Sequence, residues 1–262
     1  MQEHRRRKRF FSRVLNAIFR FGPKFYFSRD FSTFILHYID PYIYMNKWFT
    51  RPFNGQVTRH RQIQHISNIV KPDIAIETGT FLGTSTPYLA TMVSGNTYTI
   101  EFVAKYAKKA RMRFDNEFKN LGITLIEGNS VKEIQVLLKT IPSTSTILAY
   151  LDAHWEKELP TAQELNELLR WGNNWVAVID DFKVPGDDSY GFDQYGELVV
   201  DQSLIPQGVR LLVPNQSAKS ESGARKGTAY VFGPAYKNEN LTKNFPDLRE
   251  VSSIELPTAP SI

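Results

Sequence analysis

Cysteine is absent from this chain of 262 residues. Disulfide bonds, thiol catalysis, cysteine-ligated zinc and iron–sulfur clusters are therefore excluded. Long apolar runs are absent too, since no stretch approaches the roughly 18 residues that a bilayer-spanning helix needs. The basic N-terminus lacks an uninterrupted apolar core and a small-residue cleavage site, so we predict no signal peptide. These absences favour a cytoplasmic protein, with contact at a membrane surface as an option.

Acidic residues are scarce only at the start of the chain. Residues 1–60 hold 12 Lys and Arg against 3 Asp and Glu, a net charge of +9, whereas residues 61–262 hold 20 against 24, a net charge of −4. Apolar residues between Phe10 and Phe19 recur at helical spacing with Arg and Asn between them. Three interpretations stay open: peripheral membrane contact through residues 1–30, a lid over a substrate pocket, or a packed appendage that contacts the domain or the partner of a homodimer.

From Asp73 onward, apolar strand-like runs alternate with helical stretches. We expect strands at 74–77, 97–102, 123–127, 146–151, 175–180, 209–213 and 228–232. We expect helices at 56–70, near 84–93, 103–120, 130–139 and 160–171, and a further one around 196–204.

Near-continuous apolar strands separated by helices indicate a parallel sheet that is covered on both faces. The polar, turn-rich segment before the last strand indicates an antiparallel hairpin. The predicted fold class is therefore α/β, a doubly wound, seven-stranded, mostly parallel Rossmann-like sheet with an antiparallel last strand. Residues 1–55 form a basic, aromatic N-terminal extension or lid in this interpretation, and residues 56–262 form the main domain.

Polar residues follow three consecutive predicted strands. In "ETGTFLG", Gly79 permits a tight turn after the first strand, and Gly83 removes a side chain that would obstruct a ligand or a closely packed helix. Glu101 ends the second strand, where an acidic residue can accept both hydroxyls of a ribose. Asn129 follows the third strand and either reads an adenine edge or caps the next helix. These three strand ends favour an adenosine-containing ligand.

The first turn is ill-suited to a dinucleotide. Three bulky residues, Thr80, Phe81 and Leu82, follow Gly79, so the spacing G-x-G-x-x-G that accommodates a pyrophosphate is missing. Glu77 would repel a phosphate and suits an ammonium group instead. An adenosyl group that bears an amino acid fits this turn better. The predicted cofactor-binding residues are Glu77, Thr78, Gly79, Gly83, Thr84, Ser85, Glu101, Asn129 and Ser130.

Carboxylates follow the fourth and fifth predicted strands. Asp180 and Asp181 lie 28 and 29 residues after Asp152, one β-α unit along the chain. Three carboxylates at one sheet edge repel one another unless they are protonated or share a cation. Oxygen ligands suit Mg²⁺, so we predict a magnesium site at Asp152, Asp180 and Asp181. Asp187, Asp188 and Asp193, in the following loop, are either a second cation site or turn-forming residues.

Taken together, these motifs resemble the class I S-adenosylmethionine-dependent methyltransferases over roughly residues 60–235. The closest likeness is to the cation-dependent O-methyltransferases of the catechol and macrocin types. The resemblance implies that Glu77, Gly79 and Gly83 frame the methionine end of S-adenosylmethionine and that Glu101 binds its ribose. It places Asn129 and Ser130 near the adenine and assigns Mg²⁺ to the three carboxylates. His154 stands where the macrocin type has an Asp.

The expected function is Mg²⁺-dependent O-methylation of a small-molecule hydroxyl on a sugar, a phenol or a natural product. A metal that chelates substrate oxygens would lower the hydroxyl's pKa, and His154 or Asp152 would take its proton. His154 has the alternative role of a hydrogen-bonded histidine at the rim. Two other functions stay open: a non-methylating or non-enzymatic adenosine-binding protein on the same fold, and a nucleic-acid methyltransferase. The negative charge of residues 61–262 argues against the last, so no nucleic-acid partner is expected.

Overall fold

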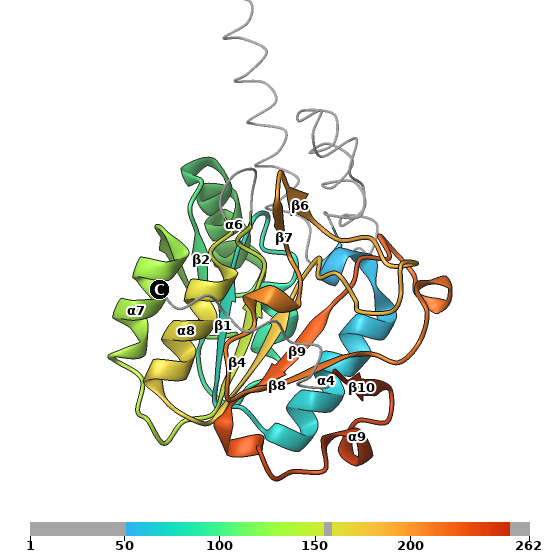
Figure 1. Ribbon diagram of the computed structural model, residues 1–262. Coiled ribbons are helices and arrows are strands. Elements are labelled where there is room, and N and C mark those ends of the chain that lie inside the picture. Colours follow the sequence, from blue (N-terminus) through green and yellow to red (C-terminus); the bar gives the residue numbers. More distant parts are fainter. Residues whose placement is uncertain (1–50, 155–158, 252–262) are drawn as a thin grey trace, which may run out of the picture.

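The computed structural model describes residues 51–154 and 159–251. Their centre is an eight-stranded sheet in the order β10-β8-β9-β5-β4-β1-β2-β3 (Figure 1). The strands are β1 (Ile74–Thr78), β2 (Thr97–Glu101), β3 (Ile123–Glu127), β4 (Ile147–Leu151), β5 (Trp175–Ile179), β8 (Arg210–Pro214), β9 (Ala229–Phe232) and β10 (Leu248–Glu250). Strands β1 to β5 are parallel, whereas β9 runs antiparallel to β5 and β8.

This arrangement confirms the predicted doubly wound, mostly parallel sheet. The structure adds an eighth strand, β10, which pairs antiparallel with β8 at the sheet edge. With three residues, β10 is too short to show a periodic pattern in the sequence.

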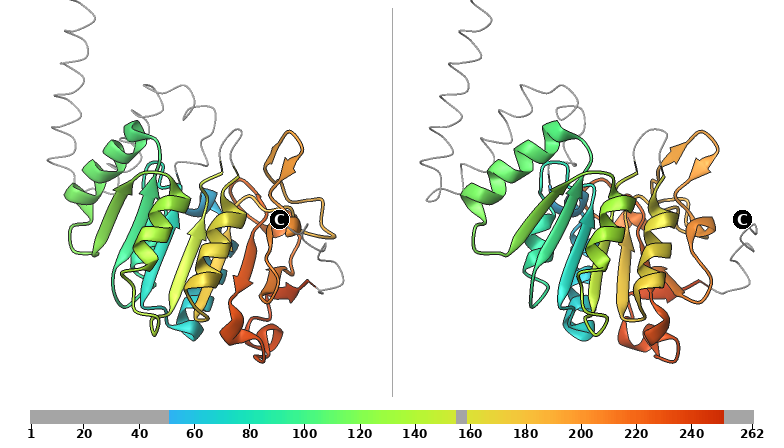
Figure 2. Two further views of the ribbon diagram at one scale, coloured as in Figure 1. Left: turned by 60° about the vertical axis from the view of Figure 1, so that its left-hand side comes forward. Right: turned by 90° about the vertical axis from the view of Figure 1, so that its left-hand side faces the viewer.

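Helices cover both faces of the sheet (Figure 2). They are α4 (Val57–Val70), α5 (Thr86–Ala90), α6 (Ala104–Glu117), α7 (Ser130–Leu138), α8 (Thr161–Trp171) and α9 (Leu241–Asn244). Successive strand residues point to opposite faces. In β5, for example, Ala177 packs in the core cluster with α7 and α8, and Val176 packs in the cluster with α4, α5 and α9. The central strands β4 and β5 are therefore apolar throughout, as their sequences indicate.

The helix predicted around residues 196–204 is wrong. A short hairpin of β6 (Gln194–Tyr195) and β7 (Leu198–Val199) occupies this position, followed by one 3₁₀ turn at Gln202–Leu204. Gly196 begins the two-residue turn with φ of +67°, a conformation that favours glycine and closes a hairpin. The aspartate-rich loop after β5 therefore leads into an antiparallel ribbon, which returns it to the sheet edge.

Most of the predicted N-terminal extension, including the amphipathic stretch at residues 10–19, lies outside the described residues, so its role and the division at residue 55 stay predictions. The last part of it is described: the 3₁₀ turn η2 (Pro52–Gly55) packs on the domain, with Phe53 only 1% exposed. Within residues 51–154 and 159–251, no helix combines the length and apolar character needed to cross a membrane.

Candidate functional site

A cavity of about 970 Å³ opens beyond the carboxyl ends of β1, β2, β4 and β5. The chain reverses its direction of winding between β1 and β4, and such a switch point is where doubly wound sheets bind ligands. Most of the predicted site residues line this one cavity: Glu77, Gly79, Thr84, Ser85, Glu101, Asn129, Ser130, Asp152, His154, Asp180 and Asp181.

Two predicted cofactor residues do not line the cavity. Gly83 has φ of +63°, and a Cβ there would lie 2.5 Å from the Phe114 ring of α6, so this glycine permits helix packing. The Thr78 hydroxyl donates to Glu164 at 3.4 Å and accepts from the Asp152 backbone N–H at 3.3 Å. Both residues thus support the loops around the cavity from behind.

Glu77 and Glu101 each fix a loop of the cavity wall. Glu77 is 2% exposed and accepts the hydroxyls of Thr86 at 2.5 Å and Thr99 at 2.6 Å, and burial raises its pKa to about 7. Glu101 accepts the backbone N–H groups of Phe81 at 2.7 Å and Val103 at 2.8 Å, and burial raises its pKa as well. The loop after β1 is therefore tied to the end of β2 by a carboxylate that also faces the cavity.

Asn129 performs one of the two roles expected for it. Its side-chain oxygen accepts the Lys132 backbone N–H at 3.2 Å and so caps α7. The capped helix end lines the cavity next to Ser130, which keeps both residues at the predicted edge.

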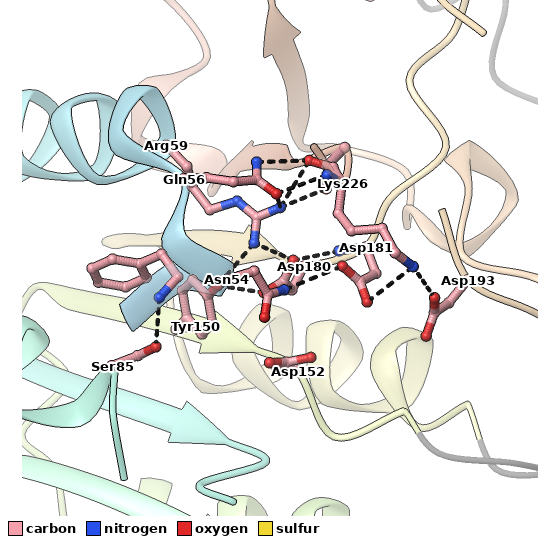
Figure 3. A network of polar contacts seen from close by, with 12 residues as sticks. Asn54, Gln56, Arg59, Ser85, Tyr150, Asp152, Asp180, Asp181, Asp193 and Lys226 are labelled. Atoms are coloured by element: carbon pink, nitrogen blue, oxygen red, sulfur yellow. Dashed lines mark hydrogen bonds and ion pairs between the residues drawn. The ribbon is translucent and has the colours of Figure 1, made fainter. Parts of the chain in front are cut away.

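Asp180 lies at the centre of a buried polar network (Figure 3). One carboxylate oxygen, Oδ1, accepts from the Arg59 guanidinium and from the Asp181 backbone N–H at 2.6 Å. The other, Oδ2, accepts from the Tyr150 hydroxyl at 2.5 Å and the Asn54 amide at 3.2 Å. Burial alone would raise the pKa of Asp180, but Arg59 and these hydrogen bonds hold it below its usual value.

The predicted metal triple does not form as one set. Among the described residues, the side chains whose candidate ligand atoms all lie within 4.8 Å of one another are His154, Asp181 and Asp193. Asp181 belongs to both sets, Asp180 is paired with Arg59, and Asp152 approaches the Nε2 atom of His154 at 3.7 Å without joining the observed set. The reason is tertiary: Arg59 reaches Asp180 from α4, and the loop before β6 brings Asp193 to the cavity.

Three carboxylates surround His154. Its Nε2 lies 3.7 Å from Asp152, 4.0 Å from Asp181 and 3.8 Å from Asp193. Burial would lower the pKa of His154, but Asp181 and Asp193 outweigh it and raise that pKa. Burial and the neighbouring Asp180 raise the pKa of Asp181 to about 6, and the pKa of Asp152 lies well above its usual value because of burial and the two nearby carboxylates.

The sequence from residue 40 to residue 193 matches the model of one family, rhamnosyl O-methyltransferase/CmcI. The chain belongs to this family. The matched span contains both ends of the cavity, from Glu77 to Asp193. Membership confirms the predicted class, an S-adenosylmethionine-dependent O-methyltransferase.

Solved structures show the same fold. A protein from Klebsiella pneumoniae assigned as an O-methyltransferase is 17% identical, with a TM-score of 0.50 over 68% of this chain and 80% of that one. The O-methyltransferase from Bacillus cereus in complex with SAH is 18% identical, with a TM-score of 0.50 over 68% of this chain and 81% of that one. A search of curated proteins gives no match.

Sequence reasoning missed several residues of this candidate site. Arg59 carries a detectable signal, because it shares the buried face of α4 with Ile63 and Ile66 at helical spacing, where a charged side chain needs a partner. Lys226 contacts Asp193 and lies 3.5 Å from Asp181, and nothing in its local sequence indicates this. The Tyr195 hydroxyl donates to Asp193 at 2.7 Å, and this tyrosine lies in the segment predicted as a loop.

Proposed function

We propose that this O-methyltransferase methylates a hydroxyl group of a small polyhydroxylated molecule such as a sugar, with a divalent cation at the acidic end of its cavity. Mg²⁺ is the cation that the sequence predicts. The observation that carries the proposal is the single cavity that joins Glu77, Gly79 and Glu101 at one end to Asp152 and His154 at the other. A donor and an acceptor that bind there would meet beyond the ends of β1 and β4.

The donor end suits an adenosyl amino acid. When bound, S-adenosylmethionine would supply the methyl group from its sulfonium. Glu101 has backbone partners on both oxygens but still borders the cavity, where a carboxylate with spare lone pairs can accept ribose hydroxyls. Asn129 and Ser130 at the N-terminus of α7 would border the adenine.

The acceptor end is rich in hydrogen-bond acceptors. Asp152, Asp181 and Asp193 can each accept a hydroxyl proton, which favours an acceptor with several neighbouring hydroxyls. The description of the family, which includes rhamnosyl O-methyltransferase, supports a sugar of this kind. Phenols and other natural-product hydroxyls are the alternative acceptors. Asp152 and His154 both line the cavity, with Oδ1 of the first 3.7 Å from Nε2 of the second. Either can therefore take the proton that the acceptor loses.

The acidic end also suits a cation. His154 is 2% exposed in its side chain, and within the described part of the chain neither ring nitrogen has a hydrogen-bond partner. Buried polar atoms are normally satisfied, so an ion or a water is needed beside this ring. A divalent cation held there would lower the pKa of the acceptor hydroxyl and orient it.

Turnover of S-adenosylmethionine with a panel of sugars and phenols tests the proposal. We expect S-adenosylhomocysteine, measured by mass spectrometry, to form with at least one polyol and to fall by at least about tenfold with a chelator or with Asp152→Asn. Asp188→Asn is the matched control and should keep its activity, because Asp188 is an exposed carboxylate in the loop after β5. Turnover that survives complete cation removal would contradict the cation requirement, and phenol-only turnover would contradict the polyol.

A further inference from the structure

We infer that the cation is held by His154, Asp181 and Asp193, that Asp180 is not a ligand, and that Asp152 is then the residue left to take the acceptor's proton. The imidazole then makes the site favour Mn²⁺ or Co²⁺ over Mg²⁺. The inference rests on the proposed function only in taking the cation to serve methyl transfer.

Asp180 has no free capacity for a metal. A carboxylate offers about four lone-pair positions, and four donors occupy them: Arg59, Tyr150, Asn54 and the backbone N–H of Asp181. The Arg59–Asp180 pair is 1% exposed on each side. Breaking a buried pair leaves an uncompensated charge, so a metal would have to displace Arg59 at high cost.

His154 is a buried side chain whose ring nitrogens need a polar partner. Its imidazole is buried, and within the described residues both nitrogens are without a hydrogen-bond partner although three carboxylates lie nearby. The 4.0 Å and 3.8 Å separations of Nε2 from Asp181 and Asp193 are too long for hydrogen bonds. Two ligands that each lie roughly 2.1 Å from one ion are themselves roughly 3–4.2 Å apart, so an ion between these atoms has room.

Lys226 contacts both carboxylates of the proposed ligand set. Its ammonium group contacts Oδ1 of Asp193 and lies 3.5 Å from Oδ2 of Asp181. The Oδ2 atom of Asp193 faces His154 and accepts the Tyr195 hydroxyl. The lysine therefore neutralises the two carboxylates that a cation would share, and it competes with that cation.

The ligand types set the preference among metals. Oxygen-only sites suit Mg²⁺, whereas imidazole suits transition metals, whose affinities rise from Mn²⁺ to Co²⁺. One imidazole with two carboxylates therefore predicts tighter binding of Mn²⁺ than of Mg²⁺.

Electron paramagnetic resonance of Mn²⁺ tests the site without relying on activity. In the full wild-type chain, we expect saturable Mn²⁺ binding, displaced by Co²⁺ and at least roughly tenfold less readily by Mg²⁺. Electron spin-echo modulation should reveal coupling to one imidazole ¹⁴N. His154→Phe and Asp193→Asn should weaken Mn²⁺ binding roughly tenfold or more, Asp180→Asn should change it less than threefold, and Lys226→Met should tighten it.

The opposite results overturn the inference. These are the absence of Mn²⁺ binding, the absence of ¹⁴N coupling in the wild-type protein, or a loss with Asp180→Asn as large as with Asp193→Asn. The wild-type spectrum decides whether an imidazole binds the metal even if Asp180→Asn fails to fold. Calorimetry with S-adenosylhomocysteine separates the two proposals. If the protein binds this cofactor product but shows no metal–imidazole bond, the proposed methyltransferase function stands and the proposed metal site is wrong.

Discussion

At the scale of single residues, the glycines of the first turn have separate physical reasons. Gly79 has φ of +78°, and a Cβ there would lie 2.0 Å from the Asp152 carbonyl oxygen. The turn after β1 therefore passes directly against the end of β4, and this contact joins the part of the cavity near Glu77 to the part near Asp152. Gly83 instead accommodates the Phe114 ring. Both glycines stood out in the sequence, but only the structure separates a backbone approach from helix packing.

Gly79→Ala should disrupt the cavity. The added methyl group meets backbone atoms that cannot move aside cheaply, so we expect a loss of at least about 3 kcal/mol in the free energy of unfolding and no measurable binding of S-adenosylhomocysteine. Gly196→Ala is the matched control, because Gly196 also has positive φ but has open space where its Cβ would be. It should cost only about 1 kcal/mol. Urea unfolding and calorimetry measure both variants, and equal losses in the two would contradict the steric argument.

Glu101→Gln should weaken cofactor binding. Both oxygens of Glu101 accept backbone N–H groups, and an amide would place a donor against one of them. An unpaired buried donor costs about 1–3 kcal/mol, so we expect affinity for S-adenosylhomocysteine to fall roughly tenfold to a hundredfold. Calorimetry measures this change. Glu127→Gln, at the end of the neighbouring strand β3 and outside the cavity lining, should bind as the wild type does.

At the scale of elements, α4 is attached to the sheet by charge as well as by apolar packing. Ile63 and Ile66 pack on the sheet, and Arg59 extends to Asp180 and to the carbonyl oxygens of Lys226 and Gly227. One side chain thus connects α4, the end of β5 and the segment before β9. Helix α4 therefore helps to hold the end of β5 and the segment before β9 in place beside the cavity.

Arg59→Met should destabilise the protein by about 3–5 kcal/mol, because it leaves Asp180 buried without its counter-charge. The double variant Arg59→Met/Asp180→Leu should recover part of this loss, since an apolar pair can replace a buried ion pair at little cost. Arg61→Met, on the exposed side of the same helix, should stay within about 0.5 kcal/mol of the wild type. Chemical denaturation supplies these values, and a double variant no more stable than Arg59→Met would argue against the ion pair.

At the scale of the whole molecule, buried carboxyl groups link stability to pH. Burial raises the pKa of both Glu77 and Glu164 to about 7, from 4.5 in an unfolded chain. The folded state therefore binds more protons than the unfolded state between these values. The stability that each group contributes is fully present below pH 4.5 and is lost as the pH rises to about 7.

Glu164→Gln should remove one of these pH dependences. The variant cannot ionise, so its melting temperature should exceed that of the wild type at pH 8, by an amount that corresponds to roughly 2–3 kcal/mol, and should approach it at pH 4.5. Calorimetric melting across this range measures the difference. Glu197→Gln, on the exposed hairpin turn, is the control. A Glu164→Gln effect of the same size at both pH values would indicate a packing change instead of a titration.

Much of the fold followed from local patterns. Seven of the eight sheet strands and the helices from α4 to α8 lie where the apolar spacing predicted them, because that spacing reflects burial on one or both faces. The hairpin of β6 and β7 was not predicted, since two-residue strands leave no period to detect. The positions of Glu77, Glu101 and Asp152 at one edge also followed, because parallel strands bring their carboxyl ends together.

The sequence by itself determined which chemical groups reach the edge of the sheet: strand lengths and β-α spacing place acidic side chains there whatever the details of packing. Only the tertiary structure decided which of them are free to act. Arg59 is 121 residues from Asp180 along the chain, and Lys226 is 45 residues from Asp181. Such pairings depend on how α4 and the segment before β9 pack against the sheet, and a carboxylate whose lone pairs are filled by those neighbours cannot also serve a ligand.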